Sequence, residues 1–235
     1  MAQRVDATAA YVLHSRPYRE TSLLVDLLTL EHGLVSVVAR GARRPGSRLR
    51  ASLQPFQLLQ VGWQGRAELK NLSSAEATEV GAMLQGRSLL CGLYLNELVQ
   101  RLLRPFDPHP RLFVLFRYAL NELKLATDIE GALRTFERQL LEQLGFALDC
   151  SSLMADACYD WQADTGLRPC VAGHGFPGAH LLAIEQDCYD DPAVRRTAKH
   201  LMRVRLAALL GDRPLRSREL FLKRNLLKRE GAKDD

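Results

Sequence analysis

Short apolar runs separated by polar residues occupy the first 80 positions of the chain. We expect short strands at residues 9–13, 23–28, 34–39, 56–61 and 67–72. The segments 31–33 and 62–65 contain the glycines typical of turns between strands. Five or so short strands with one long connection favour a small β-barrel of the OB type.

After residue 80 the apolar residues recur every three or four positions, which is the period of a helix. Three such stripes lie at residues 89–102, 112–123 and 133–144. Asp107–Pro108 predicts the start of the second helix, and the capping-box spacing of Thr127 and Glu130 predicts the start of the third. Gly145 follows the third stripe and is expected to end that helix. These stripes indicate a helical bundle.

The last third of the chain changes pattern twice. Residues 150–190 are rich in glycine and proline and predict a small irregular or hairpin-like insert. Asp191–Pro192 predicts the start of another helix through about Leu210, and residues 217–229 predict a last, very basic helix. The chain is therefore expected to have an α+β fold. Its predicted domains are an OB-type barrel over 1–80, a helical domain over 81–149 and 191–235, and an insert over 150–190.

Composition limits the class of protein. The 235 residues are 47% hydrophobic and 25% charged, which is ordinary for a globular chain and excludes wholesale disorder. Apolar stretches of 18 residues without charges are lacking, and the first residues have no apolar core of a secretion signal, so we expect no membrane span. The five scattered cysteines predict reduced thiols in a cytoplasmic protein. Within the cytoplasm we expect the protein to be nucleoid-associated.

Basic residues are concentrated in two places. Residues 32–67 contain no acid, and they hold Arg40, Arg43, Arg44, Arg48, Arg50 and Arg66. Residues 195–229 contain twelve lysines and arginines against two acids. Two basic patches are a better sign of a nucleic-acid partner than the overall charge of +5. The alternative is that both are solvated faces without a partner.

Arginines on a glycine-containing loop beside a barrel suit a phosphate backbone, because the guanidinium group matches phosphate oxygens. All six arginines of residues 32–67 are therefore candidate DNA contacts. The aromatic residues that could stack on bases are Tyr11, Tyr18, Phe56 and Trp63. Each is more typical of a core, and Trp63, in a predicted turn, is the best candidate for exposure.

The sequence contains no strong sign of catalysis or of a cofactor. Cys150, Cys158, Cys170 and Cys188 lack the short paired spacing of a structural zinc site, which favours scattered thiols over a metal. The glycines of residues 173–178 match a dinucleotide fingerprint without its strand–helix context, so we interpret them as a turn cluster. Asp187, Asp190 and Asp191 could indicate a metal-dependent hydrolase, but a loop with a helix cap explains them as well. We expect a protein that is not an enzyme.

Several motifs occur in an order that resembles a known family. They are residues 12–22, 39–43, 53–56, 92–98, 133–137, 144–146 and 216–220. With these motifs in this order, the chain resembles the RecO family of bacterial recombination and repair mediators. The resemblance implies an N-terminal OB domain, a helical domain and a small insert that in some members binds zinc through four cysteines. It also implies binding of single- and double-stranded DNA without use of ATP.

The resemblance further implies partners and contact residues. Family members anneal complementary strands coated with single-strand binding protein (SSB) and work with RecR to load recombinase. The main DNA contacts would be Arg40, Arg43, Arg44, Arg48 and Arg50, with weaker ones at Lys199, Arg203, Lys223 and Arg224. Arg134, with Leu133 and Phe136, would hold the acidic, hydrophobic C-terminal tail of SSB.

Two alternatives stay open at this point. Arg134 could instead be a surface arginine paired with Glu130 or Glu137. The protein could also be a basic adaptor that binds acidic partners, with DNA contact secondary.

Overall fold

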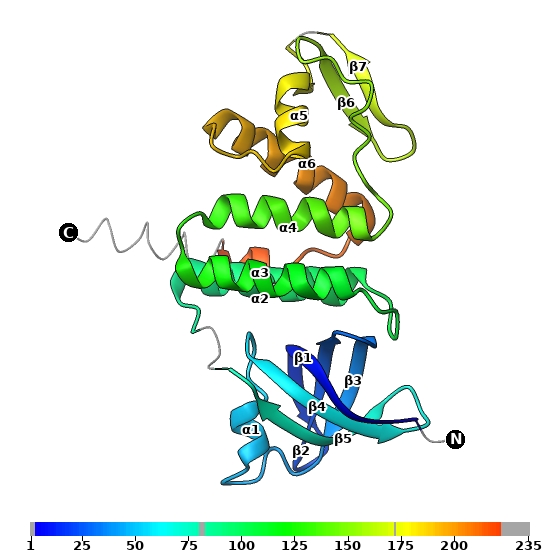
Figure 1. Ribbon diagram of the computed structural model, residues 1–235, viewed down its shortest axis with the longest axis vertical. Helices are drawn as coiled ribbons and strands as arrows, with labels where there is room; N and C mark the ends of the chain where they lie inside the picture. Colours follow the sequence, from blue (N-terminus) through cyan, green and yellow to red (C-terminus); the bar gives the residue numbers. More distant parts are fainter. Residues whose placement is uncertain (1–2, 80–82, 172, 222–235) are drawn as a thin grey trace, which may run out of the picture. The chain divides into compact units, whose positions relative to one another are not determined.

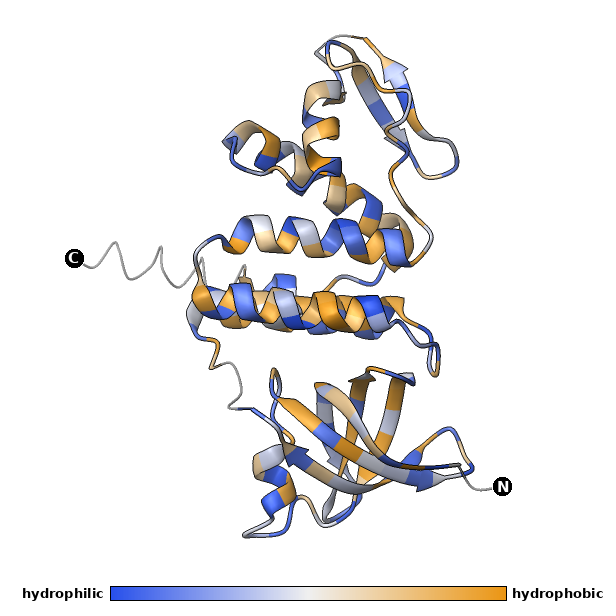
Figure 2. Cartoon of the chain, in the orientation of Figure 1, coloured by the Kyte–Doolittle hydropathy of each residue, from blue (hydrophilic) through white to orange (hydrophobic). Residues whose placement is uncertain are grey.

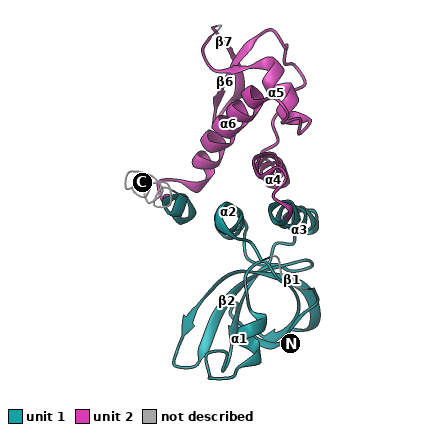
Figure 3. Ribbon diagram, turned by 90° about the vertical axis from the view of Figure 1, so that its left-hand side faces the viewer, with its two compact units in different colours: residues 1–124, 215–235 teal, residues 125–214 magenta. Residues whose placement is uncertain are grey.

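The computed structural model describes residues 3–79, 83–171 and 173–221 (Figure 1). Contacts divide the chain into two compact units (Figure 3). Unit 1 comprises residues 1–124 and 215–235, and unit 2 comprises residues 125–214. None of the helices within the described residues is both long and apolar enough to cross a membrane.

Five strands of unit 1 form a closed barrel in the order β1-β2-β3-β5-β4. Their bounds are β1 (Gln3–Tyr18), β2 (Ser22–Thr29), β3 (Gly33–Ala39), β4 (Leu58–Gly65) and β5 (Lys70–Ala77). Neighbours are antiparallel except β3 and β5, and β4 pairs back onto β1. A short helix, α1 (Arg48–Ser52), lies between β3 and β4 (Figure 1). The α+β fold with an N-terminal OB-type barrel is thus confirmed.

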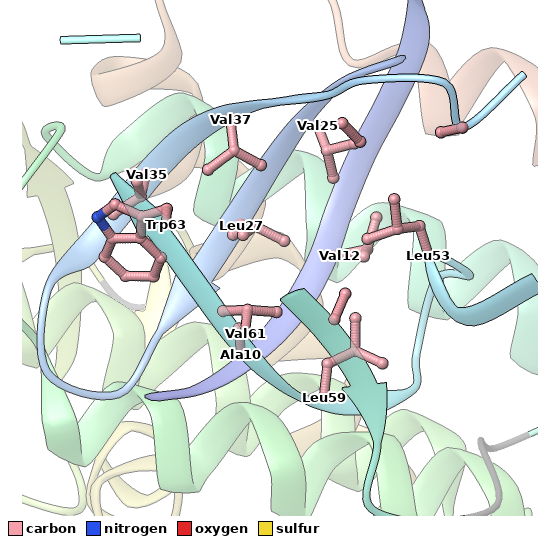
Figure 4. Packing of buried hydrophobic residues seen from close by; sticks show 13 residues of the cluster. Ala10, Val12, Val25, Leu27, Val35, Val37, Leu53, Leu59, Val61 and Trp63 are labelled. Atoms are coloured by element: carbon pink, nitrogen blue, oxygen red, sulfur yellow. The ribbon is translucent and has the colours of Figure 1, made fainter. Parts of the chain in front are cut away.

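The barrel interior follows from the two-residue period of its strands, because alternate side chains of a strand face the same side. The cluster of buried side chains is Ala10, Val12, Val25, Leu27, Val35, Val37, Ala39, Ala42, Leu53, Leu59, Val61, Trp63 and Ala75 (Figure 4). Trp63 is 1% exposed and lies inside β4. The predicted turn over residues 62–65 is therefore wrong. Gly62 permits a close approach of two strands instead, since a Cβ there would lie 2.5 Å from the Asp6 carbonyl oxygen.

The outer face of β1 is buried against helices of the same unit. The ring of Tyr11 lies 5.3 Å from the rings of both Phe113 and Phe116 on α3 (Pro110–Leu125). Asn96 on α2 (Gly86–Leu102) donates from Nδ2 to the Leu13 carbonyl at 2.9 Å. In Figure 2 hydrophobic residues recur between hydrophilic ones along both helices, which gives each helix one face to bury.

The described residues of unit 2 form three helices and a small sheet. Its elements are α4 (Ile129–Gln143), β6 (Cys158–Gln162), β7 (Gly166–Cys170), β8 (Phe176–Pro177), α5 (Gly178–Glu185) and α6 (Pro192–Leu210). Both α4 and α5 pack against α6. The strands β6 and β7 form an antiparallel hairpin to which β8 adds, so the predicted hairpin insert is present. The predicted domain limits remain predictions.

The helix starts differ in detail from the sequence predictions. Helix α3 begins at Pro110, two residues after Pro108, with proline at its first position. Asp128, rather than Thr127, caps α4 by accepting a hydrogen bond from the Gly131 amide at 3.0 Å. Asp191 caps α6 as predicted, accepting from the Ala193 amide at 2.7 Å.

Glu97 on α2 anchors the start of the C-terminal helix, which the structure describes over residues 216–221. Its carboxylate accepts hydrogen bonds from the amides of Arg216 and Ser217 at 2.9 Å and from the Ser217 hydroxyl at 2.7 Å. Partial burial opposes ionisation of Glu97, but the bonds from Ser217 and Arg216 outweigh it and hold the pKa below its usual 4.5. Two of the resembling motifs, residues 92–98 and 216–220, thus contact each other.

Replacing Glu97 with alanine is expected to loosen residues 216–221 by about 1–3 kcal/mol, because two amides and a hydroxyl lose a charged acceptor. Hydrogen exchange at the amides of Arg216 and Ser217 measures this change. Since the folded pKa is depressed, the stabilisation is present above pH 4.5 and is lost as the pH falls through the folded value. The exposed Glu76→Ala variant is the matched control; equal exchange in both variants would refute the anchoring role.

Candidate nucleic-acid interface

The segment from Arg40 to Arg50, here called the arginine segment, is fixed to the barrel by small and apolar residues. Ala42 is fully buried, and Leu53, just after the segment, is 2% exposed; both belong to the barrel core. Leu49 on α1 packs against the same core. Gly41 has a φ of +70°, a conformation that favours glycine and turns the chain directly after β3. The backbone of the segment is therefore held in place while its long side chains remain outside.

The arginines of the segment face solvent. Arg40, Arg43, Arg44, Arg48 and Arg50 are all exposed. The ion pairs found within residues 3–79, 83–171 and 173–221 include none of these five arginines. Guanidinium groups without carboxylate partners keep their donors available for phosphate oxygens. This arrangement suits binding of a polyanion.

The turn between β1 and β2 joins the arginine segment at the same end of the barrel. The Arg43 amide donates to the Thr21 carbonyl at 2.9 Å, and its Nη1 donates to the carbonyls of Arg19 and Glu20 at 3.3 Å. The Arg19 guanidinium lies 5.3 Å from the centre of the Tyr18 ring. Arg43 therefore helps to hold the turn, and the turn itself contributes the exposed Arg19.

The DNA contacts predicted from the sequence did not include the basic residues at this end of the barrel, which are Arg16 near the end of β1 and Arg19 in the turn. Arg16 and Arg19 are exposed and Tyr18 is partly exposed. The signal that could have found them is the hairpin itself, because a turn after β1 must lie beside the end of β3 when β2 pairs with both strands. These three residues extend the candidate interface.

Arg66 does not join the arginine segment. It is exposed in the connection from β4 to β5. There it lines a pocket with Glu31, His32, Glu68, Lys70, Phe106 and Pro108. The connection from β2 to β3 contributes to this pocket, so Arg66 lies at the opposite end of β2 from the β1–β2 turn, roughly 25 Å away for eight residues of strand. The pocket lining contains the carboxylates of Glu31 and Glu68 as well as the cations of Arg66 and Lys70, so it does not have the excess of positive charge found in the arginine segment.

Three of the four candidate stacking aromatics are core residues. Tyr11, Phe56 and Trp63 are 3%, 7% and 1% exposed. Burial raises the pKa of the Tyr11 hydroxyl to about 12. The prediction that Trp63 is the best exposed candidate is wrong, because β4 continues through the predicted turn and directs the indole into the barrel. Tyr18 is the remaining candidate.

The C-terminal basic run has mixed roles. Lys199 and Arg203 are exposed on α6, four residues apart and hence on one face. Arg195 instead forms an ion pair with Asp128, with Nη1–Oδ1 and Nη2–Oδ2 distances of 2.7 and 2.9 Å. Arg205 is 4% exposed and donates to the Phe146 carbonyl, and burial lowers its pKa to about 10. Lys223 and Arg224 lie outside the described residues.

The predicted tail-binding residues lie on one buried side of α4. Arg134 is 9% exposed and is held by Glu137 through two contacts of 2.9 Å, one from Nη2 to Oε1 and one from Nη1 to Oε2. Its Nε is buried and has no hydrogen-bond partner within the described part of the chain. Leu133 is 9% exposed and Phe136 is fully buried. Of the two suggested intramolecular partners, Glu137 makes this ion pair.

Two of the aspartates considered for metal chemistry have structural contacts in unit 2. Within residues 3–79, 83–171 and 173–221 no group of three or more His, Cys, Asp or Glu side chains is placed to hold a metal ion. Asp187 is engaged by Arg138, with contacts of 2.8 Å from Nε and 2.6 Å from Nη2. Burial opposes ionisation of Asp187, but these bonds keep its pKa below the usual value. Asp191 caps α6, which is the structural explanation suggested by the sequence.

Comparisons with known proteins agree along most of the chain. A family model described as "Recombination protein O N terminal" matches residues 1–80, and "Recombination protein O C terminal" matches residues 83–157. The DNA repair protein RecO of Methylococcus capsulatus is 45% identical over 228 residues, which cover 93% of each chain. That of Marinobacter nauticus is 45% identical over 94% of this chain and 96% of the relative. That of Coxiella burnetii is 40% identical over 94% of this chain and all of the relative.

Proposed function

The chain belongs to the RecO family of DNA repair proteins, and from this membership we propose that it binds DNA through the arginine segment and anneals complementary strands. The observation that carries the proposal is a set of five exposed arginines on a fixed segment of an OB-type barrel, none of which pairs with a carboxylate of the described residues. Partly exposed Tyr18 offers a stacking surface beside them. Contacts of this kind bind the sugar–phosphate backbone and give little base specificity.

The mechanism of annealing that we propose is electrostatic. Two strands repel each other as polyanions, and cations held at one surface reduce that repulsion until base pairing takes over. The exposed Lys199 and Arg203 on α6 are candidate contacts for a second strand. No covalent step and no nucleotide hydrolysis is needed for this process.

Annealing of complementary oligonucleotides coated with SSB, measured across a salt series, tests the proposed activity. We expect annealing that needs no nucleotide and that decreases as salt rises. The Lys199→Glu/Arg203→Glu variant is expected to retain binding of one strand through the arginine segment and to anneal more slowly. Annealing that depends neither on salt nor on the cations of the arginine segment and of α6 would refute the mechanism.

The proposed partners are SSB, RecR and the recombinase that they help to load. For SSB the proposed site is Arg134 with Leu133 and Phe136. A terminal carboxylate could accept a hydrogen bond from Arg134 Nε, which has no partner within the described residues. The apolar side chains would then receive the hydrophobic part of the tail. Because all three residues are largely buried, binding at this site requires α4 to become more accessible.

Replacing Arg134 with alanine is expected to weaken binding of an acidic SSB-tail peptide about tenfold, because a charged hydrogen bond to the carboxylate is lost. Isothermal titration of the peptide measures this. The Glu137→Gln variant is the control for disturbance of the buried ion pair, and melting curves of both variants report folding. Unchanged peptide affinity in folded Arg134→Ala would place the tail elsewhere. Equal losses of peptide affinity and folding in the two variants would assign Arg134 a structural role.

A further inference from the structure

Two cysteines face each other across the hairpin of unit 2. Cys158 is the first residue of β6 and Cys170 is the last residue of β7, and the two are direct partners in the antiparallel register. Residues directly opposite in such a pair have Cα atoms about 4.5–5.5 Å apart and side chains on the same face. A disulfide requires a Cα separation of about 4.4–6.8 Å. The backbone therefore already has the spacing that a bridge needs.

Both thiols are accessible and are close to each other. Each residue is partly exposed and reduced in this structure. The Cys170 Sγ donates to the His174 carbonyl at 2.7 Å, and a Cβ on Gly175 would lie 2.8 Å from that sulfur. Glycine at position 175 thus leaves room for the Cys170 side chain. Desolvation and then the neighbouring Cys158 and Asp160 raise the pKa of the Cys170 thiol.

The other three cysteines lie outside the strands of this sheet. Cys91 and Cys150 are buried, and burial raises the pKa of Cys150 to about 11, which makes it a poor nucleophile. Cys188 is exposed after α5, outside the strands. The pair on the hairpin is therefore distinguished by register and exposure together.

We propose that Cys158 and Cys170 form a reversible disulfide that locks the β6–β7 hairpin under oxidising conditions. The oxidant is a low-molecular-weight disulfide. The thiolate of one cysteine attacks it, forming a mixed disulfide and releasing one small thiol. The second cysteine then attacks the protein sulfur of that mixed disulfide, forming the Cys158–Cys170 bond and releasing the second small thiol. Two protein thiols are oxidised and one small disulfide is reduced to two thiols.

The bridge would change the stability of the hairpin locally. It closes a short loop and so restricts opening of the turn at residues 163–165 between the two strands. Formation of the disulfide breaks the hydrogen bond from the Cys170 thiol to the His174 carbonyl. Water can replace the thiol as donor because Cys170 is partly exposed. Cleavage by a protease within the turn is expected to slow at least about tenfold on oxidation, since cleavage requires local opening. A reductant restores the original rate.

The test uses the full chain incubated with excess glutathione disulfide, followed by alkylation of free thiols and peptide mass spectrometry. We expect one intramolecular bridge, Cys158 to Cys170, that dithiothreitol removes. Cys158→Ser and Cys170→Ser should each lose the bridge and the protease protection, whereas the matched Cys188→Ser variant should keep both. Phenylarsine oxide, which cross-links adjacent thiols, measures their proximity independently of oxidation and should bind once to the reduced chain and not to either hairpin variant.

Three outcomes would overturn the proposal. The first is a separate glutathione adduct on each of the two cysteines together with no binding of the arsenical. The second is a bridge to Cys188 or between two molecules. The third is zinc that is tightly bound in the purified reduced chain and shields both thiols. Binding of DNA by the arginine segment belongs to unit 1 and is measured separately. Failure of the disulfide would therefore not be confused with failure of the proposed function.

Discussion

Replacing Arg44, Arg48 and Arg50 together with glutamate is expected to weaken binding of single-stranded DNA by about 1,000-fold, or roughly tenfold for each reversed charge. Each change removes one attraction to phosphate and adds one repulsion. The three residues are exposed and have no ion partner within the described chain, so their replacement leaves no carboxylate unpaired. Fluorescence anisotropy with a labelled oligonucleotide of mixed sequence measures the affinity.

The design of this variant follows from the contacts of the segment. Arg43 is left unchanged because its guanidinium also holds the β1–β2 turn through two carbonyls. Arg66→Glu is the matched control, since it makes the same charge change at the opposite end of the barrel; we expect less than about a threefold effect. For each reversed charge in the arginine segment we expect about a tenfold loss of DNA affinity. An equal loss of affinity in Arg66→Glu would indicate a general effect of charge and would refute a local interface.

Replacing Trp63 with alanine is expected to lower the free energy of unfolding by about 3–5 kcal/mol, as for other large aromatic residues removed from a core. The indole is 1% exposed and lies among the interior residues of the barrel (Figure 4). The centre of the His32 ring lies 5.2 Å from that of the indole, in an edge-on arrangement. Urea denaturation followed by circular dichroism measures the change. The cost arises from the cavity and the lost contacts inside the barrel.

Trp63→Phe separates this structural role from a role in stacking on bases. Phenylalanine keeps an aromatic ring and removes the indole N–H, which is buried without a partner in the described structure. The variant is expected to fold and to bind DNA with unchanged affinity. A base-stacking residue would behave differently: the alanine variant would remain stable and its DNA affinity would fall about tenfold or more.

The barrel could be predicted from the sequence because the residues of its interior recur at every second position of short apolar runs. Val25 and Leu27, or Val35 and Val37, enter the core in alternation with outward residues. The turn assigned to residues 62–65 was wrong because glycine in a strand can mark a close approach of two backbones. Gly62 lies against the Asp6 carbonyl, a contact between distant positions that no local pattern contains.

The arginine segment could be predicted because a long stretch without acids leaves its cations unpaired. Arg16 and Arg19 could not be found in this way, because they join the interface only through the pairing of β2 with β1 and β3. The acid-free stretch also contains Arg66, and the sequence alone does not show that this residue lies at the other end of the barrel. The sequence does not distinguish Arg195 and Arg205 from surface cations. In the structure Arg195 pairs with Asp128 and Arg205 donates a hydrogen bond to the Phe146 carbonyl, so both have structural roles within unit 2.

The salt dependence of DNA binding tests the electrostatic interface most directly. The logarithm of the association constant is measured against the logarithm of salt concentration for the unaltered chain and for the Arg44→Ala/Arg48→Ala/Arg50→Ala variant. If each of the five arginines of the segment neutralises one phosphate of a single strand, together they contribute about −3.5 to the slope, and removal of three of them makes the slope less negative by about 2.1. Equal slopes for the two proteins would contradict an interface built on these arginines.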